Sequence, residues 1–188
     1  ADVVARISAI AADHTSTPDD GFAAVWAGHG GLLGFAGYGP SRALVTASGE
    51  PRHDVILGLS VRDSFNSVFR KPTWQPGILS DEISRGPQLL LPHREHVLFR
   101  AAPIEFADAA WAERAPWADV QVPQWTASPS LLWPDDRAWV LTTEVDWDSS
   151  VVAGSPALIA ALCADDRIEA LPLEPESSLL SDSDHVNR

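Results

Sequence analysis

Cysteine, lysine and long apolar runs are almost missing from this chain of 188 residues. The only cysteine is Cys163, so no disulfide can form within the chain and a zinc site built from several thiolates is excluded. No uninterrupted apolar stretch is long enough to cross a bilayer, and the first residues do not have the pattern of a secretory signal. We therefore expect a cytoplasmic protein without a membrane-spanning helix.

Positive charge is also scarce, because 13 basic residues stand against 26 acidic ones and the formal net charge is −13. The deficit lies almost wholly in the second half, since residues 1–94 carry a net charge of −1 and residues 95–188 a net charge of −12. An acidic surface repels phosphate backbones, so nucleic acid is not an expected partner. A basic protein is the expected partner, although an acidic surface also serves solubility alone.

What the chain does contain is apolar bulk. Its residues are 45% hydrophobic and include eight tryptophans, which is enough for the core of one globular domain. We expect residues 1–188 to form that domain, with residues 173–188 as an acidic, serine-rich tail. Several tryptophans lie in proline-rich stretches such as PTWQP and LLWPDD, where we expect surface loops. Core packing explains most of these tryptophans, but those beside acids can also form a recognition patch.

Apolar periodicity predicts short helices and strands that do not alternate regularly. Helices are expected over residues 2–13, 60–71, 104–114 and 155–163, and strands over residues 22–28, 55–60, 95–102, 138–148 and 168–173. Ser155 and Pro156 give the last helix an N-cap and a favourable first position. This pattern indicates an α+β fold, a largely antiparallel sheet packed with about four short helices and long loops rich in proline, glycine and tryptophan.

The clearest strand pattern, AWVLTTEVDWD at residues 138–148, carries an acid at every second position near its end. Alternation places its apolar residues on the core side and its acids on the opposite face. The apolar set is Trp139, Leu141, Val145 and Trp147, and the acids are Glu144, Asp146 and Asp148. Successive acids are then roughly 6–7 Å apart, a separation that suits two-carboxylate hydrolysis. A solvated sheet face is the simplest interpretation, followed by a partner-binding surface and then by catalysis or metal binding.

Two enzyme families have motifs similar to this stretch. EVDWD resembles the catalytic strand of the family 16 glycoside hydrolases, with Glu144 at the nucleophile position and Asp148 at the acid/base position. Those enzymes are all-β jelly rolls, whereas this sequence predicts four helices. DWDSS resembles the nucleophile loop of the haloacid dehalogenase-like phosphatases, which begins their domain and is followed by a required lysine. Only 40 residues follow Asp148 here, and none is a lysine.

Two other motifs give no cofactor or metal site. GHGGLLG follows a predicted strand and is similar to a dinucleotide-binding loop, but Gly34 and Gly37 break the helix that such a loop needs. His93 and His96 in LPHREH would point to opposite faces of a strand, which prevents them from binding one metal ion. Cys163 lies within a predicted helix and is expected in the core rather than as a nucleophile. We therefore expect no cofactor and no metal.

Three segments together carry a wider resemblance: VWAGHGGLL near residue 25, HVLFRAAP near residue 97 and the block SPSLLWPDDRAWVLTTEVDWDSSVVAGSPALIAAL. They resemble a family of uncharacterised actinobacterial proteins, and the likeness covers most of the chain. Its most specific pattern is W-P-x-D-R-x-W…T-E-[IV]-D…G-S…L-I. No activity is attached to this family, so the resemblance implies no functional residues; it implies a cytoplasmic protein of a high-GC bacterium.

The acidic second half, the loop tryptophans and the lack of a coherent catalytic set favour a non-enzymatic, acidic protein-interaction module of the immunity or antitoxin kind. The alternative is a hydrolase or a small-ligand-binding protein that uses a row of carboxylates on a strand. The candidate binding residues are Trp133, Asp135, Asp136, Glu144, Asp146 and Asp148. The solvent exposure of Glu144 and its neighbours distinguishes the two interpretations.

Overall fold

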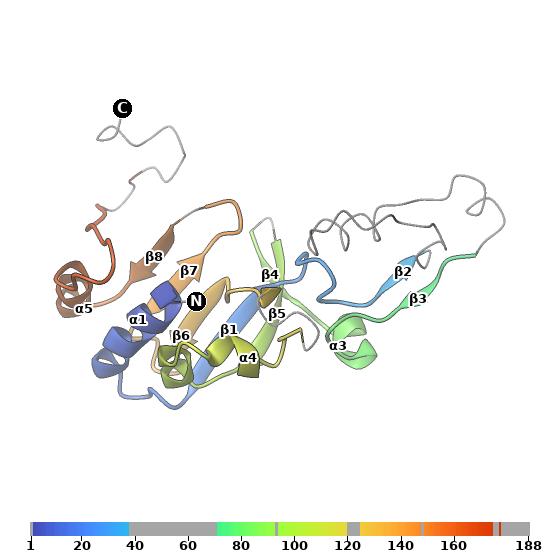
Figure 1. Cartoon of the computed structure of the whole chain (residues 1–188), viewed down its shortest axis with the longest axis horizontal. Helices are drawn as coiled ribbons and strands as arrows, with labels where there is room; N and C mark the ends of the chain where they lie inside the picture. The colour runs from blue at the N-terminus through green and yellow to red at the C-terminus, as the bar shows by residue number, and fades with distance from the viewer. Residues whose placement is uncertain are drawn as a thin grey trace, which may run out of the picture.

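A six-stranded antiparallel sheet forms the centre of the protein, which confirms the predicted α+β class (Figure 1). The computed structural model describes residues 2–37, 71–92, 94–119, 125–147, 149–174 and 177. Across the sheet the strands are β4 (Leu89–Leu91), β5 (Arg94–Arg100), β1 (Gly21–Trp26), β6 (Leu131–Pro134), β7 (Val140–Thr143) and β8 (Ser150–Ala153), each antiparallel to the next. The expected strand 55–60, almost all of the expected helix 60–71 and most of the tail 173–188 lie outside the described residues.

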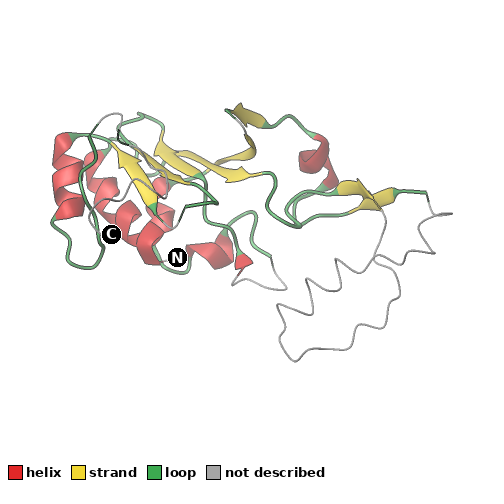
Figure 2. Ribbon diagram, turned by 90° about the horizontal axis from the view of Figure 1, so that it is seen from above, coloured by secondary structure: helices red, strands yellow, loops and turns green. Residues whose placement is uncertain are grey.

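The helices of the main body lie on one face of this sheet (Figure 2). They are α1 (Asp2–Ala11), the 3-10 helices η1 (Ala12–His14) and η2 (Pro103–Ala107), α4 (Trp111–Arg114) and α5 (Pro156–Cys163). The core lies between the two layers, where Val25, Leu132 and Leu141 of the strands meet Ile7 of α1 and Leu158 of α5. Leu132, Leu141 and Leu158 are completely buried, and each such side chain contributes roughly 1.5–3 kcal/mol through the hydrophobic effect.

Helix α5 begins as its sequence predicts. The Ser155 hydroxyl accepts a hydrogen bond from the Leu158 amide at 3.2 Å, and Pro156 occupies the first turn, where its missing amide hydrogen costs nothing. The helix buries Leu158 and Leu162, which are four residues apart and so share one face. Cys163 follows Leu162 by one position and therefore points away from this face. It is exposed, so the expectation of a core cysteine is wrong.

Two other expected elements differ from the structure. The expected helix 104–114 is split into η2 and α4, because the Asp108 carboxylate accepts a hydrogen bond from the Ala110 amide at 3.0 Å and forms a turn between them. The expected strand 168–173 is irregular, and Leu171 is 77% exposed. Apolar alternation alone does not produce a strand there, since this segment pairs with no strand among the described residues.

A small second sheet extends from one end of the main body, formed by β2 (Phe35–Gly37) and β3 (Thr73–Gln75) beside α3 (Asp81–Arg85) (Figure 1). We call residues 28–37 and 71–88 the arm. Its base is joined to itself by backbone hydrogen bonds from Ile78 to Gly31 and from Leu79 to Leu32. Leu32 and Leu79 are buried in the main core, so the base of the arm is part of the folded body.

Candidate functional site

The acidic stretch lies in a hairpin turn and not on a strand. β7 ends at Thr143, and the Trp147 amide donates a hydrogen bond to the Glu144 carbonyl at 3.1 Å before β8 begins at Ser150. The prediction of one strand over residues 138–148 is therefore wrong beyond Thr143. Val145 is 55% exposed because it lies in this turn, whereas Trp139 and Leu141 are buried as predicted. Asp148 lies outside the described residues.

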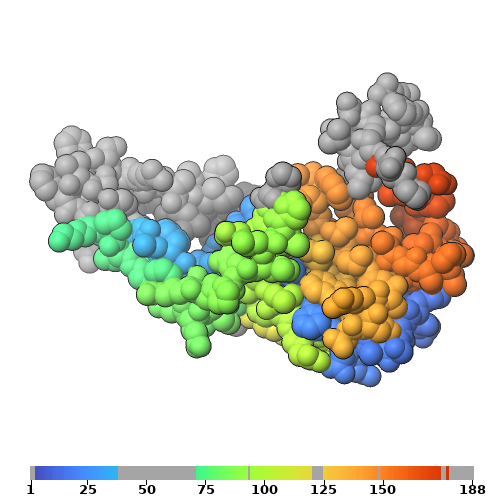
Figure 3. All heavy atoms as spheres, turned by 180° about the vertical axis from the view of Figure 1, so that it is seen from behind, coloured from blue at the N-terminus to red at the C-terminus, as the bar shows by residue number. Residues whose placement is uncertain are grey.

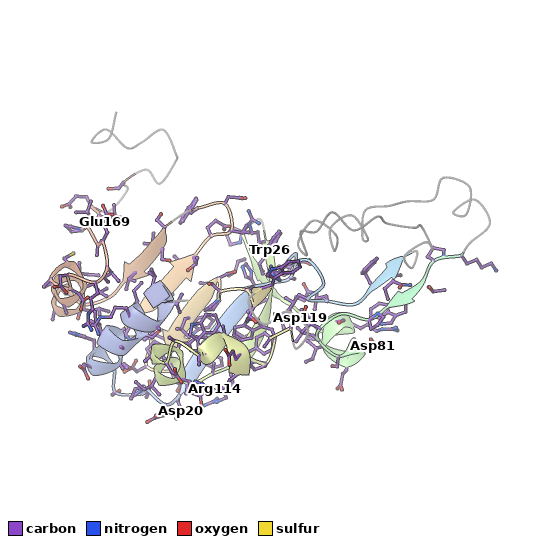
Figure 4. All side chains as sticks on the ribbon, viewed as in Figure 1. Asp20, Trp26, Asp81, Arg114, Asp119 and Glu169 are labelled. Carbon is purple, nitrogen blue, oxygen red and sulfur yellow. The ribbon has the colours of Figure 1, made fainter. Side chains whose placement is uncertain are left out.

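Glu144 and Asp146 both bind the same arginine, Arg94 at the start of β5. Arg94 Nε lies 3.1 Å from Glu144 Oε1, and Arg94 Nη2 lies 2.5 Å from Asp146 Oδ2. The Arg94 guanidinium also lies 4.8 Å from the centre of the Trp26 ring. Trp26 stands where the main sheet meets the arm, as Figure 4 shows. The two acids therefore fasten the tip of the β7–β8 hairpin to a strand that is three places away in the sheet.

This arrangement determines what the two carboxylates can do. Their charges face a guanidinium, and the Asp146 side chain is 75% exposed. An open hollow of about 690 Å³ lies next to Arg94 and Trp26, but neither Glu144 nor Asp146 lines it. A pair of carboxylates that flanks a substrate in an enclosed cleft, as two-carboxylate hydrolysis requires, is not formed by these two residues.

Asp136 is fixed within the structure by hydrogen bonds. Its carboxylate accepts from the backbone amides of Ser16 at 2.7 Å and Ala138 at 3.0 Å, and from the Thr15 hydroxyl at 2.8 Å. The two amides, followed by the hydroxyl groups of Ser16 and Thr15, hold the pKa of Asp136 well below its ordinary value. Asp136 thus joins the β6–β7 hairpin to the segment after η1, while Asp135 beside it is exposed.

Arg137 closes the same hairpin in a conformation that L-residues avoid. Its φ is 56°, and it is the only residue other than glycine with a positive φ among those described. Its amide donates to the Pro134 carbonyl at 3.0 Å, so residues 134–137 form a β-turn whose last member is left-handed. This conformation costs an L-residue about 1–2 kcal/mol, which is why glycine or asparagine is usual there.

The Arg137 side chain lines an open pocket of about 420 Å³ together with Trp133, Trp139, Val140 and Ala153. Sequence reasoning selected Trp133 but missed Arg137. The signal for Arg137 was present, because the four-residue turn PDDR places an arginine at the last turn position, where glycine is favoured. Reading it requires knowing that β6 and β7 pair across this loop.

The sheet face that points away from the helices carries apolar side chains, of which Leu98 is exposed and the others are half-buried. Strand alternation and register bring onto it six large side chains that are not members of the helix-covered core: Phe22, Trp26, Leu98, Leu131, Trp133 and Val140. We call these residues the open face. Figure 3 looks onto this side of the molecule, where atoms of β5 (green) and of β6–β8 (orange) form the surface.

Aromatic rings and arginines dominate the open face. Phe22 stacks on Trp133 with ring centres 5.5 Å apart, and Arg100 lies over Phe22 at 5.6 Å. Leu98 lies between Arg94 and Arg100 along β5 and is 45% exposed. A side chain this apolar, at this exposure and beside stacked aromatic rings, is typical of a surface that binds another molecule.

His96 lies on the same side of β5 and is only 5% exposed. Burial is the largest cause of the lowering of its pKa, so the imidazole is neutral at pH 7. Its Nδ1 atom has no hydrogen-bond partner among the residues that the structure describes. His93, the other histidine of the motif, lies outside the described residues.

No family model matches this chain, and no curated protein or solved structure is significantly similar to it. Within the described ranges, no group of three or more histidine, cysteine, aspartate or glutamate side chains is placed to hold a metal ion. No helix in the same ranges is long and apolar enough to cross a membrane. The structure defines a two-layer α+β protein. Helices pack on one face of its sheet, and the other face carries aromatic side chains.

Proposed function

We propose that this protein is a cytoplasmic, non-enzymatic interaction module that binds a protein of positive net charge on its open face. The observation that carries the proposal is the cluster of apolar and aromatic side chains on the sheet face opposite the helices. Antiparallel sheets that pack helices on one face usually present polar residues on the other. An exposed leucine beside stacked aromatic rings, as Leu98 is here, suits the binding of another molecule.

The composition of the open face supports a protein as the occupant. Tryptophan, phenylalanine and arginine are enriched at protein interfaces, and lysine is depleted. Here Trp26, Trp133 and Phe22 lie beside Arg94 and Arg100, and the described strands of this face carry no lysine. Aromatic and arginine side chains are also the residues that most often dominate binding energy.

The charge of the protein supports a basic partner. The net charge of −13 creates a field that accelerates encounter with a positively charged protein. Exposed acids lie at both ends of the open face, with Asp135 on the β6–β7 hairpin and Asp146 on the β7–β8 hairpin. The overall negative charge and these two exposed acids, rather than Arg94 and Arg100 on the face itself, would attract the basic target of an immunity or antitoxin-like inhibitor. Membership of the actinobacterial family remains part of this proposal.

The alternative, a hydrolase that uses the carboxylate row, receives less support. Two of its three acids are ion-paired with Arg94 and lie in a turn rather than in a cleft. Asp135 and Asp136 lie on the other hairpin, at the opposite end of the sheet. The acids chosen from the sequence therefore do not converge on one site.

Affinity capture from the native host with a matched pair of variants tests the proposal. Leu98→Asp places a charge in the centre of the open face. Leu171→Asp places the same charge in the segment 168–173, outside the open face, at a side chain that is 77% exposed. We expect the wild type and Leu171→Asp to recover the same protein of positive net charge, and Leu98→Asp to lose it by at least about tenfold in affinity. Unchanged melting temperatures establish that both variants fold.

Two results would contradict the proposal. One is a partner that binds Leu98→Asp as tightly as it binds the wild type, which would place its contact outside the open face. The other is a specific partner of negative net charge, which would remove the electrostatic part of the argument.

A further inference from the structure

We propose that the pocket between Arg137 and Trp133 binds a small organic carboxylate, with the guanidinium on the carboxylate and the apolar part of the ligand on the indole. The pocket shares Trp133 and Val140 with the open face, but binding of a small ligand there does not depend on the protein-docking role proposed above. It lies at the end of the sheet where the β6–β7 hairpin turns, and its residues come from β6, β7, β8 and that hairpin.

The first support is that Arg137 has no ion-pair partner among the described residues of a strongly acidic protein. The structure describes seven arginines, and six of them form ion pairs with carboxylates: Arg6, Arg85, Arg94, Arg100, Arg114 and Arg167. Arg137 makes no ion pair or hydrogen bond through its guanidinium within the described part of the chain. With 26 acidic residues in the sequence, a free guanidinium beside a pocket is unusual.

The second support is the conformation of this residue. A φ of 56° suits glycine, and an arginine held there stores strain that the fold must offset. Such strained residues cluster at ligand-binding and active sites, because the side chain is needed at that place. Arg137 is one of the residues that line the pocket, which gives the strained residue a use.

The third support is the chemistry of the pocket. Beside the one guanidinium its lining side chains are apolar or indole, namely Trp133, Trp139, Val140 and Ala153. A guanidinium binds a carboxylate through two parallel hydrogen bonds, and the apolar walls bury a hydrocarbon or aromatic body. The volume of about 420 Å³ lies within the range of small-ligand sites.

The neighbouring acid does not occupy Arg137. The Asp136 carboxylate is turned towards the Ser16 and Ala138 amides and the Thr15 hydroxyl, and so is held away from the guanidinium. A monoanion is favoured over a dianion such as phosphate, because a single cation opposes the field of a protein with a charge of −13.

Titration of the full chain with hexanoate tests the site. Binding is monitored by the indole N–H signal of Trp133 in two-dimensional NMR. Hexanamide serves as the neutral probe of the same shape and inorganic phosphate as the anion without an apolar body. We expect saturable binding of hexanoate with a shift of the Trp133 signal, binding of hexanamide at least about tenfold weaker, and no saturable binding of phosphate. The signal is assigned with Trp133→Phe.

Three variants separate the site from a general effect of charge. Arg137→Gln should weaken hexanoate binding by about tenfold or more and leave hexanamide binding unchanged. Arg100→Gln is the matched control, because Arg100 lies on the same face but is ion-paired with Asp20 at 3.1 Å. Arg137→Gly should abolish the preference for hexanoate while raising the melting temperature by about 2–4 °C, because the strain is relieved.

The proposal is overturned if hexanoate does not saturate, if hexanamide or phosphate binds as well as hexanoate, or if Arg100→Gln weakens binding as much as Arg137→Gln. Loss of binding in Arg137→Gly without a rise in melting temperature would retain the ligand site but overturn the inference that strain is kept for it. Partner capture through Leu98 is unaffected by each of these outcomes.

Discussion

Replacement of Arg94 by glutamine tests whether the acids of the β7–β8 hairpin serve the structure. The substitution keeps most of the aliphatic stem and removes the guanidinium that binds Glu144 at 3.1 Å and Asp146 at 2.5 Å. The Glu144 side chain is 33% exposed and the Asp146 side chain 75% exposed, so solvent screens the second ion pair more strongly.

The expected loss is the sum of three modest contributions. The Glu144 pair contributes about 0.5–1 kcal/mol, the Asp146 pair less than about 0.5 kcal/mol, and the contact with the Trp26 ring about 0.5–1 kcal/mol. The free energy of unfolding should therefore fall by about 1–2.5 kcal/mol, which corresponds to a decrease in melting temperature of about 2–10 °C in a chain of this size. Urea unfolding followed by tryptophan fluorescence measures the change.

A double-mutant cycle with Glu144→Gln isolates the ion pair itself. We expect a coupling energy of about 0.5–1 kcal/mol between positions 94 and 144, which should decrease in 1 M salt. If the two substitutions are additive within about 0.3 kcal/mol, Arg94 does not hold the hairpin acids and their structural explanation fails.

Two other predictions concern the sheet and the second hairpin. Asp136→Asn should make the free energy of unfolding less dependent on acid. Hydrogen bonds lower the pKa of the Asp136 carboxyl in the folded state, so its contribution to stability is present above about pH 4 and is lost as the pH falls through the folded pKa. Urea unfolding from pH 7 to pH 2 should therefore show a smaller loss of stability in this variant than in the wild type or in Asp135→Asn. Gly21→Ala should destabilise by about 1–3 kcal/mol, because the new methyl group would lie 2.3 Å from the Trp133 carbonyl oxygen and 2.9 Å from Pro134 Cα, whereas Gly30→Ala meets no atom within 4 Å and should leave the urea midpoint almost unchanged; equal midpoints for the two alanine variants would contradict the pairing of β1 with β6.

Local signals were sufficient to predict some elements. The start of helix α5 is determined by two adjacent residues, the N-cap Ser155 and the first-turn Pro156. Their effect on the helix does not depend on contacts with distant parts of the chain. The alternation of Trp139 and Leu141 likewise identified the buried side of β7, because a half-buried strand imposes a period of two residues.

The end of that strand could not be predicted in the same way. The alternation of apolar and acidic residues continues through Glu144–Trp147, although the chain turns there. The position of the turn is fixed by Arg94, which is 50 residues before Glu144 in sequence and three strands away in the sheet. A pattern read along the chain does not contain this contact.

The open face was hidden for a related reason. Tryptophan and phenylalanine are residue types typical of a core, so the sequence does not distinguish Trp133 and Phe22 from core residues. The pairing of β6 with β1 shows that both lie opposite the helices. The role of Arg137 depends on this fold as well, because its left-handed conformation belongs to the turn 134–137 that joins β6 to β7. Sheet register is therefore the information that the sequence pattern lacked.

Hydroxyl-radical footprinting of the complex tests the open face most directly, because it reports the solvent exposure of side chains rather than of the backbone. With the captured partner bound, oxidation of Trp26, Leu98 and Trp133 should fall by at least about half. Leu171, in the irregular segment 168–173, should remain as reactive as in the free protein. Protection of Leu171 with no change at Leu98 and Trp133 would show that the partner binds elsewhere and that the open face is not the binding surface.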